Sequence, residues 1–276
     1  MYVIYTLNKF IIKVLRRDPK RNYKKSRIFF FYFKVFINTL KYYKKYSLYK
    51  AKIVYVTKSK EIHFTKSNVY VKYFDNRIQK KYLFLLKNKI ISDYSFKNGF
   101  LRQPFYEITQ INVPKLDLLE KVVNSHLNSL YSLKLFLSVN YFSALEKRVL
   151  KIKINEADKK LVDEIFPFLK KKEIYKSIVH GDLWLGNILM IDNQINLIDW
   201  DDLSFKSFSY DMFYFYFQEY KSDFYSFYKD YDLIKTKILP IFMKTVEKFN
   251  MKISDTDYLD YYNVFLLERL LHRYEK

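Results

Sequence analysis

The stretch SIVHGDLWLGNILMIDNQINLIDWDD, residues 177–202, holds two of the three glycines and both tryptophans of the 276-residue chain. Its two apolar runs, ILMI and INLID, are joined by DNQ, which is typical of a turn between antiparallel strands. Such a hairpin brings Asp182 and Asn187, which precede its first strand, to the same end as Asp199, which ends its second. The stretch therefore predicts a hairpin beside which two carboxylates and one amide converge.

Oxygen ligands of this kind suit one type of chemistry. Mg²⁺ binds through one or two carboxylates, waters and substrate phosphates. Phosphoryl transfer uses such an ion to neutralise phosphate charge, while another carboxylate accepts a proton from the attacking hydroxyl. The alternative for Asp182 and Asn187 is a loop stabilised only by hydrogen bonds between side chains and backbone. Because Asp199 is in register with both residues, we favour the phosphotransfer interpretation.

The motifs in this stretch resemble those of a known group of enzymes. HGDLWLGN, followed twelve residues later by the Asp of LIDWDD, is similar to the catalytic and metal-binding motifs of aminoglycoside phosphotransferases, choline kinases and fructosamine kinases. YDM, residues 210–212, resembles the segment that follows the metal-binding aspartate in this group. These are small-molecule kinases with a protein-kinase-like fold. The resemblance therefore implies an ATP- and Mg²⁺-dependent transfer of phosphate to a hydroxyl of a small molecule.

The resemblance also implies a role for individual residues. Asp182 would be the catalytic base that orients and deprotonates the acceptor hydroxyl, and His180 would support its loop. Asn187 and Asp199 would hold Mg²⁺ against the nucleotide phosphates. Asp211 of YDM would anchor the loop by hydrogen bonds to its backbone.

The region before this stretch predicts a small sheet. Residues 52–74 contain three short strands, KIVYV, EIHFT and VYVKYF, separated by the polar breaks TKSK and KSN. Apolar residues at helical spacing predict a helix over 77–90, packed on that sheet. VYVK resembles the V-A-I-K pattern of the third kinase strand, so the resemblance implies that Lys72 contacts the α- and β-phosphates. The alternative is that Lys72 is one of 41 lysines, on a solvated strand.

Two features of this first lobe depart from the pattern of the family. It has no glycine-rich loop, so TKSK would bind phosphate through its backbone N–H groups, Ser59 and Lys60. The predicted helix has no glutamate to pair with Lys72, and Gln79 is only a neutral candidate. These departures leave a catalytically weak pseudokinase or a binding protein as the alternative function.

Helical periodicity dominates the rest of the chain, in residues 116–137 and 158–172. Together with the resemblance, this order predicts an α+β, bilobal, protein-kinase-like fold with a small antiparallel sheet lobe and a larger, mainly helical lobe. We expect a basic aromatic extension at 1–50, helical or arm-like and packed on the first lobe. The nucleotide-binding lobe would cover 51–110, and the lobe with the catalytic loop and acceptor-binding helices 111–276.

The net charge of +21 raises the question of nucleic acid binding. Lysine outnumbers arginine 41 to 9 and no nucleic-acid-binding motif accompanies the charge, which disfavours that partner. Residues 1–50 nevertheless carry 14 basic groups and only Asp18 as an acid, so RNA or membrane binding through this arm is a third candidate function. The aromatic run at 28–40 is too short to span a bilayer and suits either peripheral membrane contact or packing on the first lobe. Without a signal peptide or cysteines, we expect a cytoplasmic protein, with possible contact at the membrane periphery.

The second lobe offers candidates for binding the acceptor. Trp184, Trp200 and Asp202 lie next to the catalytic motifs, and acidic groups with aromatic faces suit a cationic amino alcohol or amino sugar. A neutral sugar, including one on a lipid-linked or surface glycan, is an alternative acceptor. The alternative is that these aromatic residues form the core and the carboxylates a solvated face.

Overall fold

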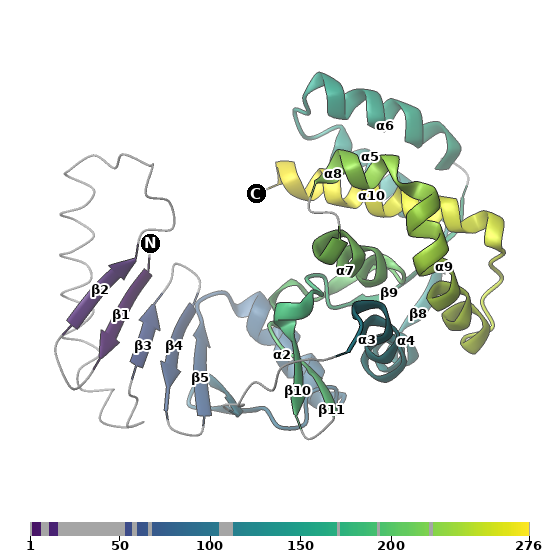
Figure 1. Ribbon diagram of the computed structural model, residues 1–276. Coiled ribbons are helices and arrows are strands. Elements are labelled where there is room, and N and C mark those ends of the chain that lie inside the picture. The colour runs from purple at the N-terminus through teal and green to yellow at the C-terminus, as the bar shows by residue number, and fades with distance from the viewer. Residues whose placement is uncertain are drawn as a thin grey trace. The chain divides into compact units, whose positions relative to one another are not determined.

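The structure is a computed structural model (Figure 1), and it describes residues 2–6, 11–15, 53–56, 60–65, 68–104, 113–169, 172–191, 194–220 and 223–275, the first three ranges as backbone only. The chain divides into two units, Met1–Glu107 and Ile108–Lys276. The first unit is built on an antiparallel sheet and the second mainly on helices, which confirms the predicted α+β fold class. The assignment of 1–50, 51–110 and 111–276 to an extension and two lobes stays a prediction.

A seven-stranded antiparallel sheet forms the first unit, in the order β2-β1-β3-β4-β5-β7-β6. Its strands are β1 Tyr2–Thr6, β2 Ile11–Leu15, β3 Ile53–Val56, β4 Lys60–Phe64, β5 Asn68–Tyr73, β6 Ser95–Lys97 and β7 Phe100–Pro104. The three strands predicted within 52–74 are β3, β4 and β5. Strands β1 and β2 lie where we expected a helix or an arm, because their backbones pair with each other and with β3. The aromatic run at 28–40 lies outside the described residues.

Alternation along β5 separates its side chains onto two faces. Every second side chain from Val69 to Tyr73 is buried, and Lys72 lies half-buried on the other face. Helix α2, Asn76–Lys87, packs on the buried face, where the Tyr73 hydroxyl donates to the Tyr82 hydroxyl across 3.1 Å. The helix predicted after the sheet is thus present, and it covers the face that Lys72 does not occupy.

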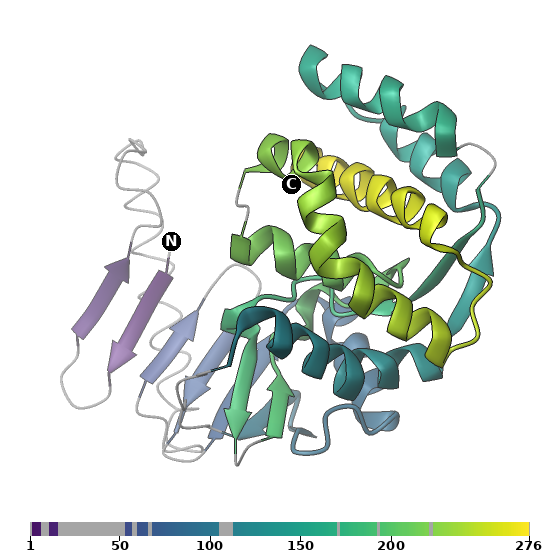
Figure 2. The ribbon, with the colours of Figure 1, turned by 45° about the vertical axis from the view of Figure 1, so that its right-hand side comes forward.

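The second unit is built mainly from helices (Figures 1 and 2). They are α3 Lys115–Val122, α4 Asn128–Leu133, α5 Tyr141–Val149, α6 Glu156–Leu169, α7 Tyr210–Tyr220, α8 Phe224–Lys229, α9 Tyr231–Lys248 and α10 Tyr258–Tyr274. A π-helical turn, Val123–Leu127, joins α3 to α4. Helix α10 contacts α5, α6 and α7, so it forms the centre of the unit. None of the helices in the described ranges is long and apolar enough to cross a bilayer.

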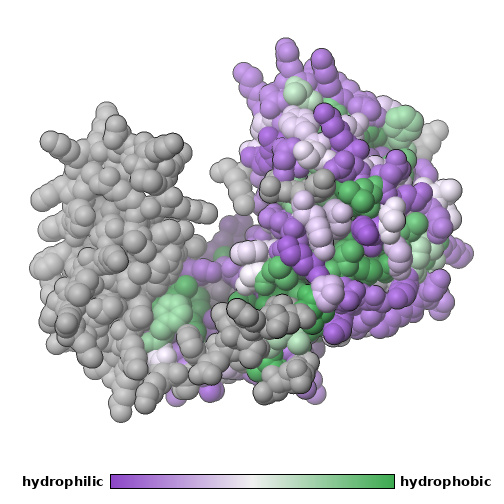
Figure 3. Space-filling model, viewed as in Figure 1, coloured by the Kyte–Doolittle hydropathy of each residue, from purple (hydrophilic) through white to green (hydrophobic). Residues whose placement is uncertain are grey.

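Aromatic rings fill the core between these helices. Phe213 of α7 lies 5.5 Å from Phe265 of α10, and Phe227 of α8 stacks on Tyr262 at 5.5 Å between ring centroids. The Tyr262 hydroxyl donates to the backbone carbonyl of Phe227 across 2.6 Å, which satisfies a polar group that would otherwise be costly to bury. Many tyrosine and phenylalanine side chains of this unit therefore form its core. The face of the unit seen in Figure 3 is mainly hydrophilic.

Two small groups of strands interrupt the helices. Strands β8 Leu135–Ser138, β9 Ile174–Val179 and β12 Ser204–Ser207 form an antiparallel sheet in the order β12-β9-β8. Strands β10 Ile188–Ile191 and β11 Gln194–Leu197 form the hairpin that DNQ predicted. The helix expected over 116–137 was wrong at its end, because Lys134 is extended and the residues after it pair with β9.

Candidate active site

Residues 180–187, here called the HGD loop, connect β9 to the hairpin, and the first turn of α7 fixes where the loop begins. The backbone N–H of His180 donates to Asp211 Oδ2 across 2.7 Å, and that of Gly181 donates to Asp211 Oδ1 across 2.9 Å. Asp211 is fully buried. Burial raises the pKa of its carboxyl, while His180 and the two N–H donors act in the opposite direction. Asp211 thus holds the loop through its backbone, in the arrangement that the resemblance implied.

The ring of His180 ties the HGD loop to the end of the hairpin. Its Nε2 lies 2.9 Å from the carbonyl oxygen of Ile198, which can only accept, so Nε2 carries the proton. Its Nδ1 accepts from the backbone N–H of Asp182 across 3.3 Å, so both ring nitrogens have partners within the protein. The ring is buried and lies 4.5 Å from that of Trp200. His180 is therefore placed to support the loop rather than to exchange protons with a substrate.

Gly181 brings the HGD loop against the turn that follows the hairpin. Its φ of 87° lies in the left-handed region, which favours glycine. A Cβ at this position would come within 2.3 Å of the backbone oxygen of Asp202. Any larger residue would push the loop away from the 3₁₀ turn Trp200–Asp202, so the first glycine of the motif is a requirement of packing.

The carboxylate of Asp182 is half-buried and held from two sides. Tyr214 of α7 donates its hydroxyl to Oδ1 across 2.6 Å. Asn187 Nδ2 lies 3.3 Å from Oδ2. Burial, and then the bond to Asp182, raise the pKa of the Tyr214 hydroxyl well above its usual range, so Tyr214 remains a donor at physiological pH. The two contacts fix the orientation of the Asp182 carboxylate.

The orientation of the Asn187 amide follows from its own contacts. Asn187 is buried, and its Nδ2 donates to the backbone carbonyl of Asp182 across 2.8 Å. Because that carbonyl can only accept, the amide nitrogen faces Asp182, and Oδ1 is the atom left to coordinate an ion. Asn187 is a ligand candidate through its oxygen.

Asp199 lies at the same end of the hairpin. Ile188 pairs with Leu197, and the N–H of Ile198 donates to the carbonyl of Asn187 across 3.0 Å. The next residue, Asp199, is exposed and has a φ of 57°, in the left-handed region. Within the described ranges no group of three or more His, Cys, Asp and Glu side chains is arranged to hold a metal. The candidate metal ligands are instead one amide, Asn187, and one carboxylate, Asp199.

Helix α7 runs along the HGD loop and contacts it at three positions. Besides Asp211 and Tyr214, Glu219 accepts the backbone N–H of Leu185 on Oε1 across 2.9 Å. Lys115 of α3 lies 3.0 Å from Glu219 Oε2 and neutralises its charge. Sequence reasoning missed the contacts of Tyr214 and Glu219 with the loop. Their spacing of three and eight residues from Asp211, on one side of an otherwise apolar helix, was the available signal.

The structure separates the three residues expected to bind the acceptor. Trp200 is fully buried, and its Nε1 donates to the carbonyl of Leu197 across 2.9 Å. It belongs to the core behind the loop, so our expectation that it binds the acceptor was wrong. Trp184 is exposed, and its ring lies over Gly186, where a Cβ would come within 2.4 Å of it. Asp202 is exposed as well.

The structure also separates the residues of the first unit that we expected to bind phosphate. Lys72 is half-buried, with its ammonium 5.8 Å from the centroid of the Phe100 ring. Lys60 pairs in register with Tyr73, which places it on the opposite face from Lys72. Its ammonium lies 5.5 Å from the centre of the Tyr73 ring, so it does not join Lys72 in one phosphate site. Ser59 lies outside the described residues.

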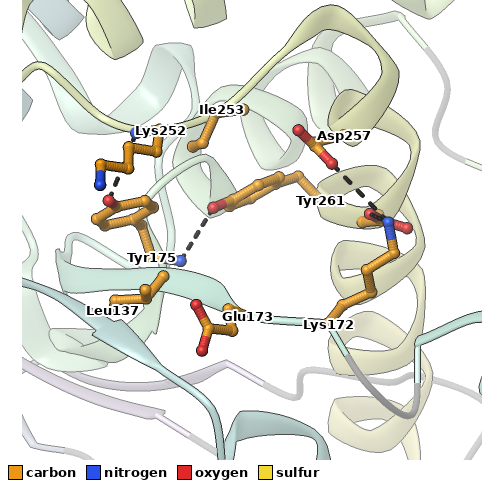
Figure 4. Close-up of a pocket in the computed structure, with 9 residues that line it drawn as sticks. Leu137, Lys172, Glu173, Tyr175, Lys252, Ile253, Asp257 and Tyr261 are labelled. Carbon is orange, nitrogen blue, oxygen red and sulfur yellow. Dashed lines mark hydrogen bonds and ion pairs between the residues drawn. The ribbon is translucent and has the colours of Figure 1, made fainter.

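A cavity of about 230 Å³ lies elsewhere in the helical unit (Figure 4). Tyr175 at the start of β9 lines it together with Lys252 and Tyr261, and the Tyr261 hydroxyl accepts the N–H of Tyr175 across 2.9 Å. The HGD loop begins at the other end of β9, about 15 Å away along the strand. This cavity is therefore no part of the candidate active site.

Comparisons with known proteins agree with the fold and the motifs. Residues 139–237, which include the HGD loop, the hairpin and α7, match the family model of fructosamine kinase. A solved macrolide 2′-phosphotransferase type I is 12% identical, with a TM-score of 0.57 over 85% of this chain and 89% of that chain. Choline kinase LicA from Streptococcus pneumoniae is 15% identical, with a TM-score of 0.47 over 86% and 99%.

None of the curated proteins compared with the chain matches it in sequence. The likeness to the macrolide phosphotransferase supplies the fold, and the match to fructosamine kinase covers the segment with the HGD loop. The chain is therefore a small-molecule phosphotransferase of the kinase type with a protein-kinase-like fold, and its acceptor group is a hydroxyl.

Proposed function

We propose that the chain transfers the γ-phosphate of ATP to a hydroxyl of a small molecule, in a Mg²⁺-dependent reaction with Asp182 as the base. The observation that carries this proposal is the Asp182 carboxylate, which is fixed on both sides while it remains partly accessible. Each carboxylate oxygen can accept two hydrogen bonds, so lone pairs are left for an acceptor hydroxyl. A base held in this way orients the hydroxyl for in-line attack and accepts its proton.

The donor set fits Mg²⁺. Asn187 would bind through Oδ1, because its amide nitrogen is engaged by the Asp182 carbonyl, and Asp199 would bind through its exposed carboxylate. Both are hard oxygen ligands, which Mg²⁺ prefers, and waters and phosphates would complete the coordination. When bound, the ion supplies neutralisation of the phosphate charge. His180, Gly181 and Asp211 position the loop and take no part in the transfer itself.

We assign nucleotide binding to the sheet unit, with Lys72 as the residue that contacts the α- and β-phosphates. Its position on β5, on the face that α2 leaves uncovered, supports this role. Ser59 and the other residues of TKSK stay candidates for the phosphate loop. The nucleotide-binding lobe at 51–110 and the catalytic lobe at 111–276 belong to the same proposal. Because ATP is the donor, we place the reaction in the cytoplasm.

For the acceptor, we favour a cationic amino alcohol or amino sugar. Trp184 offers an exposed aromatic face within the HGD loop, and Asp202 offers an exposed carboxylate beside Gly181. Both groups attract cations. A neutral sugar, free or on a lipid-linked or surface glycan, is the alternative acceptor.

A catalytically weak pseudokinase or binding protein is the second candidate function. The observation in its favour is Lys72, which has no carboxylate within ion-pair distance among the described residues. Kinases of this fold use such a pair to hold the lysine against the phosphates. The two candidates differ in turnover, because both would bind nucleotide.

The test is acceptor-dependent ATP turnover by the purified full-length chain, with Mg²⁺ and with EDTA. The acceptor panel holds choline, ethanolamine, a fructosamine, aminoglycosides, macrolides and neutral sugars. We expect wild type to phosphorylate at least one acceptor with Mg²⁺ and Asp182→Ala to phosphorylate none. Nucleotide binding without turnover on any acceptor would favour the pseudokinase, and absence of both would refute the kinase proposal.

A further inference from the structure

Strands β4 and β5 bring a carboxylate and an ammonium group opposite each other. Their antiparallel register pairs Glu61 with Lys72 and His63 with Tyr70. Residues directly opposite in such a pair point to the same face, with Cβ atoms about 4.5–5.5 Å apart. Glu61 therefore shares the face of the sheet on which Lys72 lies.

Glu61 is fully buried, and its carboxylate is only half satisfied. Oε1 lies 2.5 Å from Nε2 of His63. Oε2 is buried and has no hydrogen-bond partner among the described residues. Buried polar atoms without partners are uncommon and unfavourable, and one in a native structure calls for an explanation. Oε2 of Glu61 can therefore accept a hydrogen bond from a donor that approaches it.

Lys72 is the donor closest in register. Its ammonium lies 5.8 Å from the centroid of the Phe100 ring, and no carboxylate lies within ion-pair distance in the described part of the chain. The Phe100 ring also meets the ring of His63 edge-on, with 5.2 Å between centroids. Lys72 and His63, the hydrogen-bond partner of Glu61, therefore approach the same aromatic ring. The four-carbon stem of a lysine gives its ammonium the freedom to move between such positions.

Helix α2 cannot supply this partner. It has no aspartate or glutamate between Asn76 and Lys87. Its one amide candidate, Gln79, donates Nε2 to the backbone carbonyl of Tyr73 across 2.9 Å. The side-chain contact between Tyr73 and Tyr82 places α2 on the face of β5 opposite to Lys72. The helix thus contacts the wrong face and lacks the necessary side chain.

We propose that Glu61, on β4, is the carboxylate partner of Lys72 and positions it for the nucleotide phosphates. This inference rests on the proposed function, since it gives Lys72 a nucleotide to hold. When Mg·ATP binds, the Lys72 side chain turns from Phe100 toward Glu61. One ammonium N–H then donates to Oε2 of Glu61, and the remaining N–H groups point toward the phosphates. Because both residues belong to neighbouring strands, the register of the sheet sets the pair, and no movement of α2 is needed to form it.

The experiment is a double-mutant cycle on nucleotide affinity, measured with the full-length chain. Dissociation constants for the Mg²⁺ complex of a non-hydrolysable ATP analogue are measured by calorimetry for wild type, Glu61→Gln, Lys72→Met and the double variant. We expect Lys72→Met to weaken binding about tenfold and Glu61→Gln about fivefold. The double variant should bind the nucleotide no more weakly than Lys72→Met does. Glu61 affects affinity only by positioning Lys72, so its loss has no further effect once the lysine is gone. Asp75→Asn is the matched control, since it removes another carboxylate of the same unit, and its affinity should equal that of wild type.

Three outcomes would overturn the proposal in distinct ways. No binding by wild type removes the proposed function and the pair together. Binding that Lys72→Met weakens but Glu61→Gln does not, or effects that multiply in the double variant, removes the pair alone. If Glu61→Gln is unfolded by circular dichroism, Glu61→Asp replaces it in the cycle. This variant retains the charge on a shorter arm, and the same non-multiplying pattern is required of it.

Discussion

The polar residues of the HGD loop and those of the β4–β5 strand pair are prepared for function to different degrees. Asp182 and Asn187 already have hydrogen-bond partners, and Asp211 fixes the backbone before them. Glu61 and Lys72 lie opposite each other without forming an ion pair. On the proposed function, the fold alone holds the side chains that act in phosphate transfer, whereas Glu61 and Lys72 pair only when nucleotide binds. Substitutions in the loop should therefore affect rate and stability, and those in the strand pair mainly affinity.

The largest effect is expected for Asp182→Asn. The amide can still accept from Tyr214, but it cannot accept a proton from the acceptor, so kcat should fall by a factor of about 10²–10⁴. Nucleotide affinity should change less than twofold on the proposed division of roles. Steady-state kinetics and calorimetry on the same preparation measure both. A variant that loses affinity but keeps kcat would reverse the comparison between the two regions.

A second test compares two glycines with positive φ. Gly181 has a φ of 87° and a Cβ there would meet the Asp202 carbonyl oxygen at 2.3 Å, whereas Gly99 has a φ of 78° and open space. Gly99→Ala should lower the free energy of unfolding by about 1–2 kcal/mol, from backbone strain alone. Gly181→Ala should lower it by about 3 kcal/mol or more, because it adds a steric clash. Urea denaturation measures both, and equal losses would mean that the loop can move away from Asp202 at little cost.

Tyr214→Phe removes the hydroxyl that donates to Oδ1 of Asp182, and so tests whether this hydrogen bond orients the carboxylate for catalysis. Loss of a hydrogen bond to a charged group should reduce kcat about tenfold. Tyr216→Phe is the control, since Tyr216 lies buried on the same helix and stacks on Tyr220. If both variants lower kcat equally, Tyr214 has only a packing role.

The hairpin could be predicted from the sequence because the residues that form it are close together in the chain. DNQ between two apolar runs determines the turn, and the turn places Asn187 and Asp199 at the same end of the hairpin. The roles of Tyr214 and Trp200 depend on contacts between segments distant in sequence. Tyr214 is one of many aromatic residues in α7, and only the position of the helix beneath the loop distinguishes it. Trp200 follows Asp199 directly, but the turn buries its ring against His180.

Pairing between distant segments also explains the errors in secondary structure. LKLFL continues a helical pattern, yet residues 135–138 form a strand because β9 offers a hydrogen-bonding edge about forty residues later. The basic N-terminal residues gave no clear alternation, and β1 and β2 become strands by pairing with each other and with β3. The position of Glu61 opposite Lys72 could not be predicted from the sequence either, since it depends on the register between β4 and β5.

The smallest expected effect concerns a second strand lysine, which sharpens the contrast with Lys72. Lys206 of β12 has a side chain about 20% exposed, with its ammonium 3.5 Å from the centre of the Tyr210 ring and 3.7 Å from Glu268 Oε2. Burial lowers the pKa of Lys206 to about 8, from an ordinary value of 10.5. Between these two values the unfolded chain binds a proton that the folded chain has released, so the contribution of Lys206 to stability rises with pH in this window.

Lys206→Met should remove this dependence. The difference in free energy of unfolding, wild type minus variant, should therefore increase between pH 8 and pH 10. Urea denaturation of both proteins at these two pH values measures the difference, and the many tyrosines cancel because both chains contain them. A constant difference for Lys206→Met would mean that Glu268 holds the ammonium of Lys206 charged despite burial.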